Sequence, residues 1–183
     1  MERLDRVYGD GGVLNDGFAW WVHGKGEARE IVDGLDCAIM HGKLYKSEMI
    51  MRRADVPEGA IARFLERQKW RHGMEYWLPI ERNNQYDRKY VRALENTGWC
   101  RRAGRYVMVG PRIHSNPYGL DDVFLERLYR RRLDCPRDYY GLYGFFRTHN
   151  VFGVAAFDEA GVPCGMVLRS EYGLDWPTED YIW

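Results

Sequence analysis

The residues from Pro57 to Leu65, PEGAIARFL, combine small side chains with a basic one and follow directly on an apolar run. A strand that leads through a small-residue turn into a helix presents backbone N–H groups that can hold a phosphate. Asp55 suits the N-cap of such a helix, and Glu58, three residues later, completes a capping box. We therefore expect a helix that reaches about Trp70, with a phosphate-binding turn at its start.

The segments around this turn alternate between extended and helical patterns. Residues 35–53 alternate β-formers with polar residues around a turn at His41–Gly42, which predicts two adjacent strands. Residues 74–81 and 105–110 predict two more strands, and the apolar spacing between them predicts a helix capped by Gly98. This alternation is typical of an α/β sheet covered by helices.

The rest of the chain mixes the same patterns. Leu120, Phe124 and Leu128 have helical spacing within LDDVFLERLYRRRL, a further helix is expected over residues 137–149, and the run Asp158–Gly161 between two apolar segments predicts a hairpin. Near the N-terminus, residues 17–22 suit a short strand and residues 23–32 a glycine turn that enters a helix. We expect a core of residues 1–110, with residues 111–183 packed on the same sheet.

Residues 48–109 resemble the second half of the GNAT superfamily of N-acyltransferases, which transfer an acyl group from a coenzyme A thioester to an amine. In that family a strand leads into a Gln/Arg-x-x-Gly-x-Gly/Ala turn, and the next helix binds the pyrophosphate of the coenzyme. Here Ala60 and Ala62 stand at the glycine positions and Pro57 at the basic position. Only Ala62 fits the pattern, and Gly59 replaces the missing glycine if the turn is shifted by one residue.

The phrase LENTGW, residues 94–99, resembles the YEKLGF-like end of a helix in the same family. Catalytic members often have a tyrosine at its first position, which protonates the departing thiolate, and an asparagine two turns earlier that contacts the coenzyme. This chain has Leu94 and Asp87 at those positions. The resemblance implies Tyr90, one helical turn before Leu94, as the candidate acid, and Glu48 as the candidate general base.

The resemblance implies acetyl-CoA as the cofactor and an amine as the acceptor. The expected coenzyme-binding residues are Gly59, Ala60, Ile61, Ala62, Arg63, Asn83 and Asn84. Because the segment that suits the family's first half comes last here, the expected fold is a GNAT-like mixed sheet with permuted order, or a shortened domain with an appended half-domain. Each candidate also has a plainer role: Tyr90 as a core tyrosine, Glu48 as an exposed carboxylate and the asparagines as turn formers.

Composition restricts the remaining classes of function. The 183 residues carry no net charge, and no apolar run approaches ~18 residues, so we expect neither a general nucleic-acid coat nor a membrane protein. The four cysteines are widely spaced and form no CxxC or Cys/His cluster, which predicts reduced thiols and no metal site. We expect a cytoplasmic protein, or a virion component if a phage encodes it.

Three functions therefore stay open. The first is the acyltransferase, and the second is a catalytically silent GNAT-like structural or interaction protein, such as a phage particle component, with a protein partner or a second copy of itself. The third and least favoured is nucleic-acid binding. It stays open because residues 101–137 carry nine Arg against four acidic residues. The arginines in question are Arg101, Arg102, Arg105, Arg130, Arg131 and Arg132.

Overall fold

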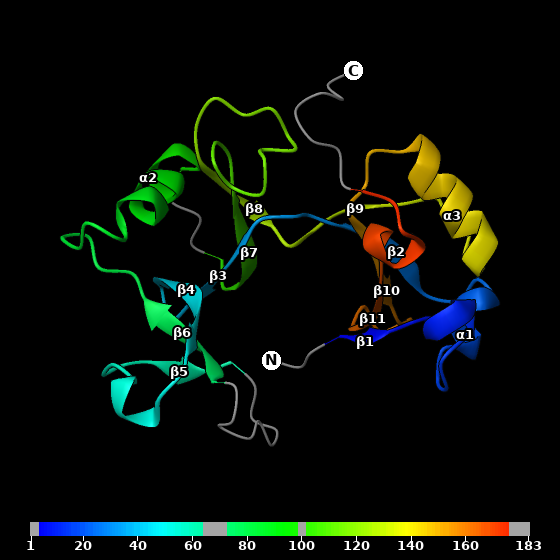
Figure 1. Ribbon diagram of the computed structural model, residues 1–183, viewed down its shortest axis with the longest axis horizontal. Helices are drawn as coiled ribbons and strands as arrows, with labels where there is room; N and C mark the ends of the chain where they lie inside the picture. Colours follow the sequence, from blue (N-terminus) through cyan, green and yellow to red (C-terminus); the bar gives the residue numbers. More distant parts are fainter. Residues whose placement is uncertain (1–3, 64–72, 99–101, 176–183) are drawn as a thin grey trace. The chain divides into compact units, whose positions relative to one another are not determined.

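The computed structural model describes residues 4–63, 73–98 and 102–175, and these residues form a mixed α/β protein with two sheets and few helices (Figure 1). Contacts divide the described chain into two compact units. Unit 1 comprises residues 33–128, and unit 2 is built from residues 4–32 together with residues 129–175. The division expected at residue 110 coincides with neither boundary.

Unit 1 is an antiparallel sheet with the strand order β5-β6-β4-β3-β7-β8. Its strands are β3 (Leu35–Met40), β4 (Lys43–Ile50), β5 (Ile61–Ala62), β6 (Met74–Pro79), β7 (Gly104–Val109) and β8 (Phe124–Arg127). Helix α2 (Arg88–Asn96) packs against one face, where Ala93 meets the buried side chains of Cys37, Tyr106 and Met108. A short 3-10 helix, η2 (Arg53–Asp55), follows β4.

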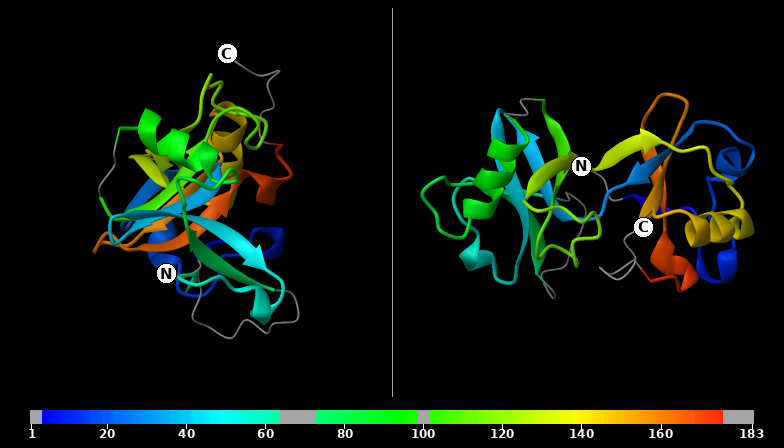
Figure 2. Two further views of the ribbon diagram at one scale, coloured as in Figure 1. Left: turned by 90° about the vertical axis from the view of Figure 1, so that its left-hand side faces the viewer. Right: turned by 90° about the horizontal axis from the view of Figure 1, so that it is seen from above.

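Unit 2 has the strand order β1-β11-β10-β2-β9, in which β1 runs parallel to β11 and the other neighbours are antiparallel. Its strands are β1 (Asp5–Arg6), β2 (Glu27–Ile31), β9 (Tyr129–Arg132), β10 (Gly153–Phe157) and β11 (Pro163–Leu168). Helices α1 (Ala19–Val22) and α3 (Tyr139–Thr148) share one core with the sheet (Figure 2). The 3-10 helices η1 (Asp10–Gly12) and η4 (Arg169–Tyr172) flank the first and last strands.

Several elements confirm the predictions from the sequence. His41 and Gly42 both have positive φ, 49° and 72°, as a two-residue hairpin turn between β3 and β4 requires. Helix α2 is followed by Gly98 in the left-handed conformation, at a φ of 67°. Strands β6 and β7, helix α3 and the β10–β11 hairpin, with Gly161 at a φ of 79°, also lie where they were expected.

The helix expected from Pro57 is not formed over the residues that the structure describes. Residues 57–60 make a turn, and Ile61 and Ala62 form β5, which pairs with Trp77 and Tyr76 of β6. The capping-box pattern was overridden because the edge of β6 offers hydrogen-bond partners to an extended chain. The rest of the expected helix, residues 64–72, lies outside the described residues.

The helix expected over LDDVFLERLYRRRL is also wrong, because this segment forms β8 and β9. A spacing of four residues fits a helix, but it fits the two-residue period of a strand equally well. Val123 and Leu125 are buried two positions apart, as in a strand, and Leu128, which is also buried, separates the two strands. β8 pairs with β7 in unit 1, whereas β9 pairs with β2 in unit 2, so residues 111–183 do not pack on one sheet.

The N-terminal expectations are reversed in the structure. Residues 19–22 form helix α1 rather than a strand, and residues 27–31 form strand β2 rather than a helix. Gly26, at a φ of 67°, lies so close to Phe157 that a Cβ atom would stand 2.0 Å from its carbonyl oxygen. The glycine turn therefore leads the chain into the sheet, where β2 pairs with β10.

Two glycines of α3 provide a matched test of the packing of this helix. A Cβ atom at Gly144 would enter open space, so Gly144→Ala should raise the free energy of unfolding by up to about 1 kcal/mol. A Cβ atom at Gly141 would stand 2.5 Å from Pro136 Cβ and 2.6 Å from Asp138 Oδ2, so Gly141→Ala should lower it by about 1–3 kcal/mol. Chemical denaturation measures both, and shifts of the same sign would contradict this packing.

Candidate functional site

At residues 55–63, where the coenzyme site was predicted, several backbone amides already donate hydrogen bonds to carbonyls of the protein. The amide of Ala60 donates to the carbonyl of Pro57 (3.3 Å), and the amide of Arg63 donates to the carbonyl of Glu75 (3.0 Å). Gly59 has a positive φ of 78° and ends the turn that leads into β5. The described residues therefore do not form the strand–turn–helix arrangement on which the coenzyme prediction rested.

The side chain of Arg63 is held against the sheet of unit 1. Its guanidinium donates to Ser47 Oγ (2.8 Å), pairs with Glu75 Oε2 (3.1 Å) and with Asp36, and lies 4.9 Å from the ring centroid of Trp77. Only 11% of the side chain is exposed. Arg63 therefore acts as a cross-strand link in this structure.

Asn83 and Asn84 lie in the turn between β6 and α2. The amide of Asn84 donates to the carbonyl of Glu81 (3.1 Å), and its side-chain oxygen accepts from the amide of Tyr86 (3.0 Å). Asn83 is exposed in the same turn. This geometry matches the turn-forming role of asparagine.

Glu48 and Tyr90, the two candidate catalytic residues, come into one electrostatic neighbourhood. Lys46 Nζ lies 2.9 Å from Asp87 Oδ1 and 3.3 Å from Glu48 Oε2, and the second oxygen of Asp87 accepts from the amide of Glu81 (3.0 Å). Burial raises the pKa of Tyr90 far above its ordinary value, and the nearby negative charges add to the effect. Tyr90 therefore keeps its proton at neutral pH and is a weak acid.

The buried pair of Lys46 and Asp87 gives a prediction for unit 1. Asp87 is 2% exposed, so Lys46→Met leaves a buried carboxylate without its cation. We expect this change to lower the free energy of unfolding by roughly 2–3 kcal/mol. The expected loss is smaller than for a fully buried pair because the Lys46 side chain is 17% exposed. The double variant Lys46→Met/Asp87→Asn should cost less than the sum of the two single changes. Additive costs would mean that the two groups do not interact.

The same pair predicts a dependence of stability on pH. Burial alone would lower the pKa of Lys46, but the hydrogen bond and charge of Asp87, followed by Glu48, raise it above the ordinary value of 10.5. The stabilisation is therefore fully present below pH 10.5 and is lost as the pH rises through the folded-state pKa. Denaturation at alkaline pH should show this loss in the wild type and not in Lys46→Met.

A pocket of about 580 Å³ lies within unit 2 and is lined by none of the candidate residues that the sequence analysis selected. It is lined by the N-terminal segment together with one residue each from α3 and η4. Its volume is typical of small-molecule sites. The lining residues are Arg6, Tyr8, Gly9, Asp10, Gly11, Asn15, Tyr139 and Glu171.

The glycine-rich loop Gly9–Gly12 contributes Gly9, Asp10 and Gly11 to the lining of this pocket. Tyr8 and Leu14 pair across the loop, and the amide of Gly9 donates to the carbonyl of Val13 (2.8 Å). Gly12 has a φ of 78°, and a Cβ atom there would stand 2.7 Å from the ring of Tyr139. Glycine is required at this position because both the backbone conformation and the contact exclude a side chain.

Tyr8 and Tyr139 form the aromatic part of the lining. Tyr139 meets Tyr8 edge to face, with ring centroids 5.5 Å apart, and Tyr172 lies behind it at 4.6 Å. The Tyr8 hydroxyl donates to the carbonyl of Arg137. Burial and the charge of Asp138 raise the pKa of Tyr8 to about 12. Both residues therefore belong to a packed aromatic cluster, in which the raised pKa keeps the Tyr8 hydroxyl neutral.

The lining of the pocket includes an ion pair. Arg6 Nη1 lies 2.6 Å from Glu171 Oε1, and the side chains are 52% and 10% exposed. Burial raises the pKa of Glu171, and the charge of Arg6 opposes this rise. The side-chain amide of Asn15 donates to the carbonyl of Arg6 (2.7 Å) and fixes the strand that carries it.

The sequence analysis missed this pocket although its signals were present. GDGG at residues 9–12 is a glycine-rich loop, and YYGLY at residues 139–143 is dense in tyrosine. Neither segment is specific alone, and only pairing of the two ends of the chain brings them together.

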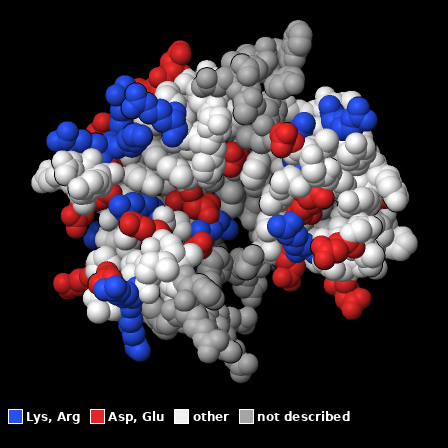
Figure 3. All heavy atoms as spheres, viewed as in Figure 1, with Lys and Arg blue, Asp and Glu red and all other residues white. Residues whose placement is uncertain are grey.

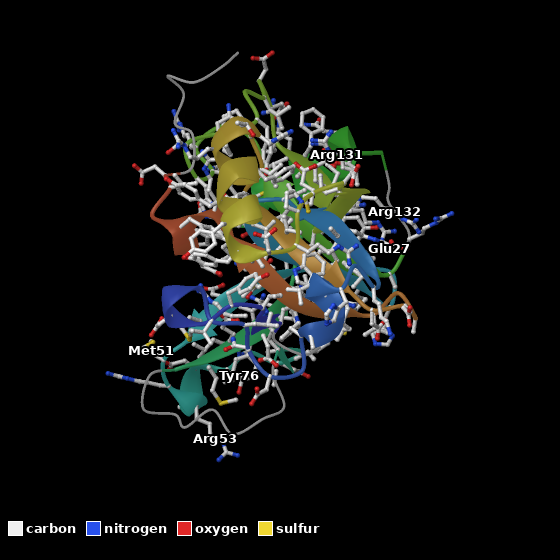
Figure 4. All side chains as sticks on the ribbon, turned by 90° about the vertical axis from the view of Figure 1, so that its right-hand side faces the viewer. Glu27, Met51, Arg53, Tyr76, Arg131 and Arg132 are labelled. Carbon is white, nitrogen blue, oxygen red and sulfur yellow. The ribbon has the colours of Figure 1, made fainter. Side chains whose placement is uncertain are left out.

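Three of the five described arginines that were proposed to bind nucleic acid pair with acidic residues. Arg131 Nε lies 2.8 Å from Glu30 Oε2, and Arg132 pairs with Glu27, so that β9 and β2 neutralise each other (Figure 4). Arg105 contacts Asp36 at 3.3 Å. Both signs of charge are interspersed over the face drawn in Figure 3. Arg101 lies outside the described residues.

Comparison with protein-family models and with curated proteins gave no match. Within the described ranges, no helix is long and apolar enough to cross a membrane, and no group of three or more His, Cys, Asp or Glu residues is placed to hold a metal ion. Cys37, Cys135 and Cys164 are free thiols, and Cys100 lies outside the described residues.

Proposed function

We propose that this chain is an interaction protein that binds a small polar ligand in the pocket of unit 2. The observation that carries the proposal is the pocket itself, where the Arg6–Glu171 pair and the rings of Tyr8 and Tyr139 border one space of about 580 Å³. A small number of polar groups in a mostly preformed wall is what a specific small-molecule site requires.

A titration followed by NMR tests this proposal. Choline, acetate, phosphate and glycerol are added separately at millimolar concentration, and the amide signals of Gly9 and Gly11, which line the pocket, are followed. At least one probe should shift these signals and leave Gly42, in the β3–β4 turn of unit 1, unchanged. Folded protein in which no probe shifts the signal of either pocket glycine would overturn the proposal.

Two neighbouring tyrosines provide a matched pair of variants for the titration. Tyr139 lines the pocket, whereas Tyr140 is 81% exposed and is absent from the lining. Tyr139→Ala should abolish the shifts produced by the active probe, and Tyr140→Ala should preserve them. Because Tyr139 also packs in the core, a circular dichroism spectrum of each variant controls for folding.

An N-acyltransferase is the second candidate, and the observation that favours it is the grouping of Glu48 and Tyr90 around Lys46 and Asp87. The GNAT-like assignment of unit 1 likewise stays a proposal, supported by the order β6, α2, Gly98 and β7. Acetyl-CoA binding is not supported at the turn, because the amides of Ala60 and Arg63 donate to backbone carbonyls.

Isothermal titration with acetyl-CoA separates the two candidates. If the chain is only a binding protein, acetyl-CoA at millimolar concentration should produce no heat of binding. Micromolar binding that disappears in Ala60→Asp, a change at an exposed turn, would favour the acyltransferase instead. Free coenzyme A serves as the control for contacts to the acetyl group.

A further inference from the structure

We infer that the pocket of unit 2 selects an organic ammonium ion, carried by a small molecule as a primary amine or a quaternary ammonium group. This inference rests on the proposed function and names its class of ligand. Three features of the pocket support it: the balance of charge, the aromatic wall and the engagement of the loop amides.

The charges around the pocket favour a cation. Asp10 and Glu171 line it, and Asp138 lies close enough to act on Tyr8 and Tyr172. Arg6 is the cation in the lining, and its charge is already opposed by Glu171 at 2.6 Å. Within the described chain, Asp10 forms no ion pair, which leaves its carboxylate available to a ligand.

The nearby Arg137 does not change this balance, because its guanidinium is used elsewhere. It donates to the carbonyls of Lys25 and of Gly26 (3.0 Å), and it lies 4.6 Å from the ring centroid of Trp21. It therefore secures the β2 end of unit 2 and is not one of the lining residues.

The aromatic wall offers the second contact that an ammonium ion requires. Tyr8 and Tyr139 line the pocket, and an aromatic side chain attracts a cation through the quadrupole of its ring. Tyrosine rings combined with a carboxylate are the components from which proteins build sites for quaternary ammonium groups.

The loop is poorly suited to the opposite choice, an anion. An anion-binding loop needs several outward amides, but two of the four in Gly9–Gly12 are engaged: Gly9 donates to the carbonyl of Val13 (2.8 Å) and Gly12 donates to the carbonyl of Gly9 (3.2 Å). An anion would also face the carboxylates of Asp10 and Glu171. The volume of about 580 Å³ suits an organic ion better than a bare metal ion.

Two pairs of probes isolate the charge of the ligand at constant shape. Choline is compared with 3,3-dimethyl-1-butanol, its neutral isostere, and n-butylamine is compared with n-butanol. We expect at least one ammonium probe to shift the amides of Gly9 and Gly11 and to bind about tenfold or more tightly than its neutral partner. The pair that responds identifies whether the site prefers a quaternary or a primary ammonium group.

Asp10 and Asp16 provide matched variants, since both are exposed aspartates of the N-terminal segment but only Asp10 lines the pocket. Asp10→Asn should weaken the binding of the active ammonium probe by about fivefold, and Asp16→Asn should leave it unchanged. Equal effects of the two substitutions would mean that the charge acts at long range, which would overturn this assignment of Asp10.

The outcomes separate the ligand class from the proposed function. If the neutral isosteres, acetate or phosphate shift the pocket glycines as strongly as the ammonium probes, the ammonium inference is wrong while the pocket remains a binding site. If no probe of any charge shifts them, both the inference and the proposed function fall.

Discussion

Unit 2 exists only if two distant parts of the chain pair with each other. β1 lies parallel to β11, and the amide of Val7 donates to the carbonyl of Met166 (3.1 Å). All of unit 1 lies between these strands in the sequence, so their pairing closes a long loop. The entropy lost in closing this loop must be offset by the burial of apolar side chains. This burial occurs in a core in which Val7 and Trp21 of the N-terminal part pack with α3 and β10.

The two units use their charged residues in different ways. In unit 1 the charged groups are largely committed to the sheet, with Lys46 paired to the buried Asp87 and Arg63 held between three acceptors. In unit 2 the Arg6–Glu171 pair borders an open space, beside rings that are already fixed by packing. A site needs side chains that are both held and accessible, and this difference is why the pocket, rather than the residues predicted in unit 1, carries the proposed function.

The fold could be predicted from the sequence where the signal was local. The His41–Gly42 turn fixed the β3–β4 hairpin, and the apolar stripe with Gly98 fixed α2. Prediction failed where a pattern fitted two structures. The four-residue spacing of Leu120, Phe124 and Leu128 suits a helix and a strand, and pairing with β7 and β2 decided in favour of strands.

The candidate site was less accessible to sequence analysis for the same reason. Glu48 and Tyr90 come together because β4 pairs with β6, the strand that directly precedes α2 in the chain. The pocket joins Arg6 to Glu171 and Gly12 to Tyr139, and no local pattern specifies contacts between residues so far apart. Such contacts follow from the sheet topology, which composition and spacing do not determine.

Hydrogen exchange at the amide of Val7 tests most directly whether the N-terminal segment completes unit 2. If it does, this amide should exchange as slowly as those of Val154 and Val167 in the β10–β11 ladder, because all three open together. Exchange of Val7 at the rate of an unfolded chain, while Val154 and Val167 stay protected, would show that β1 is not docked and that the pocket does not form.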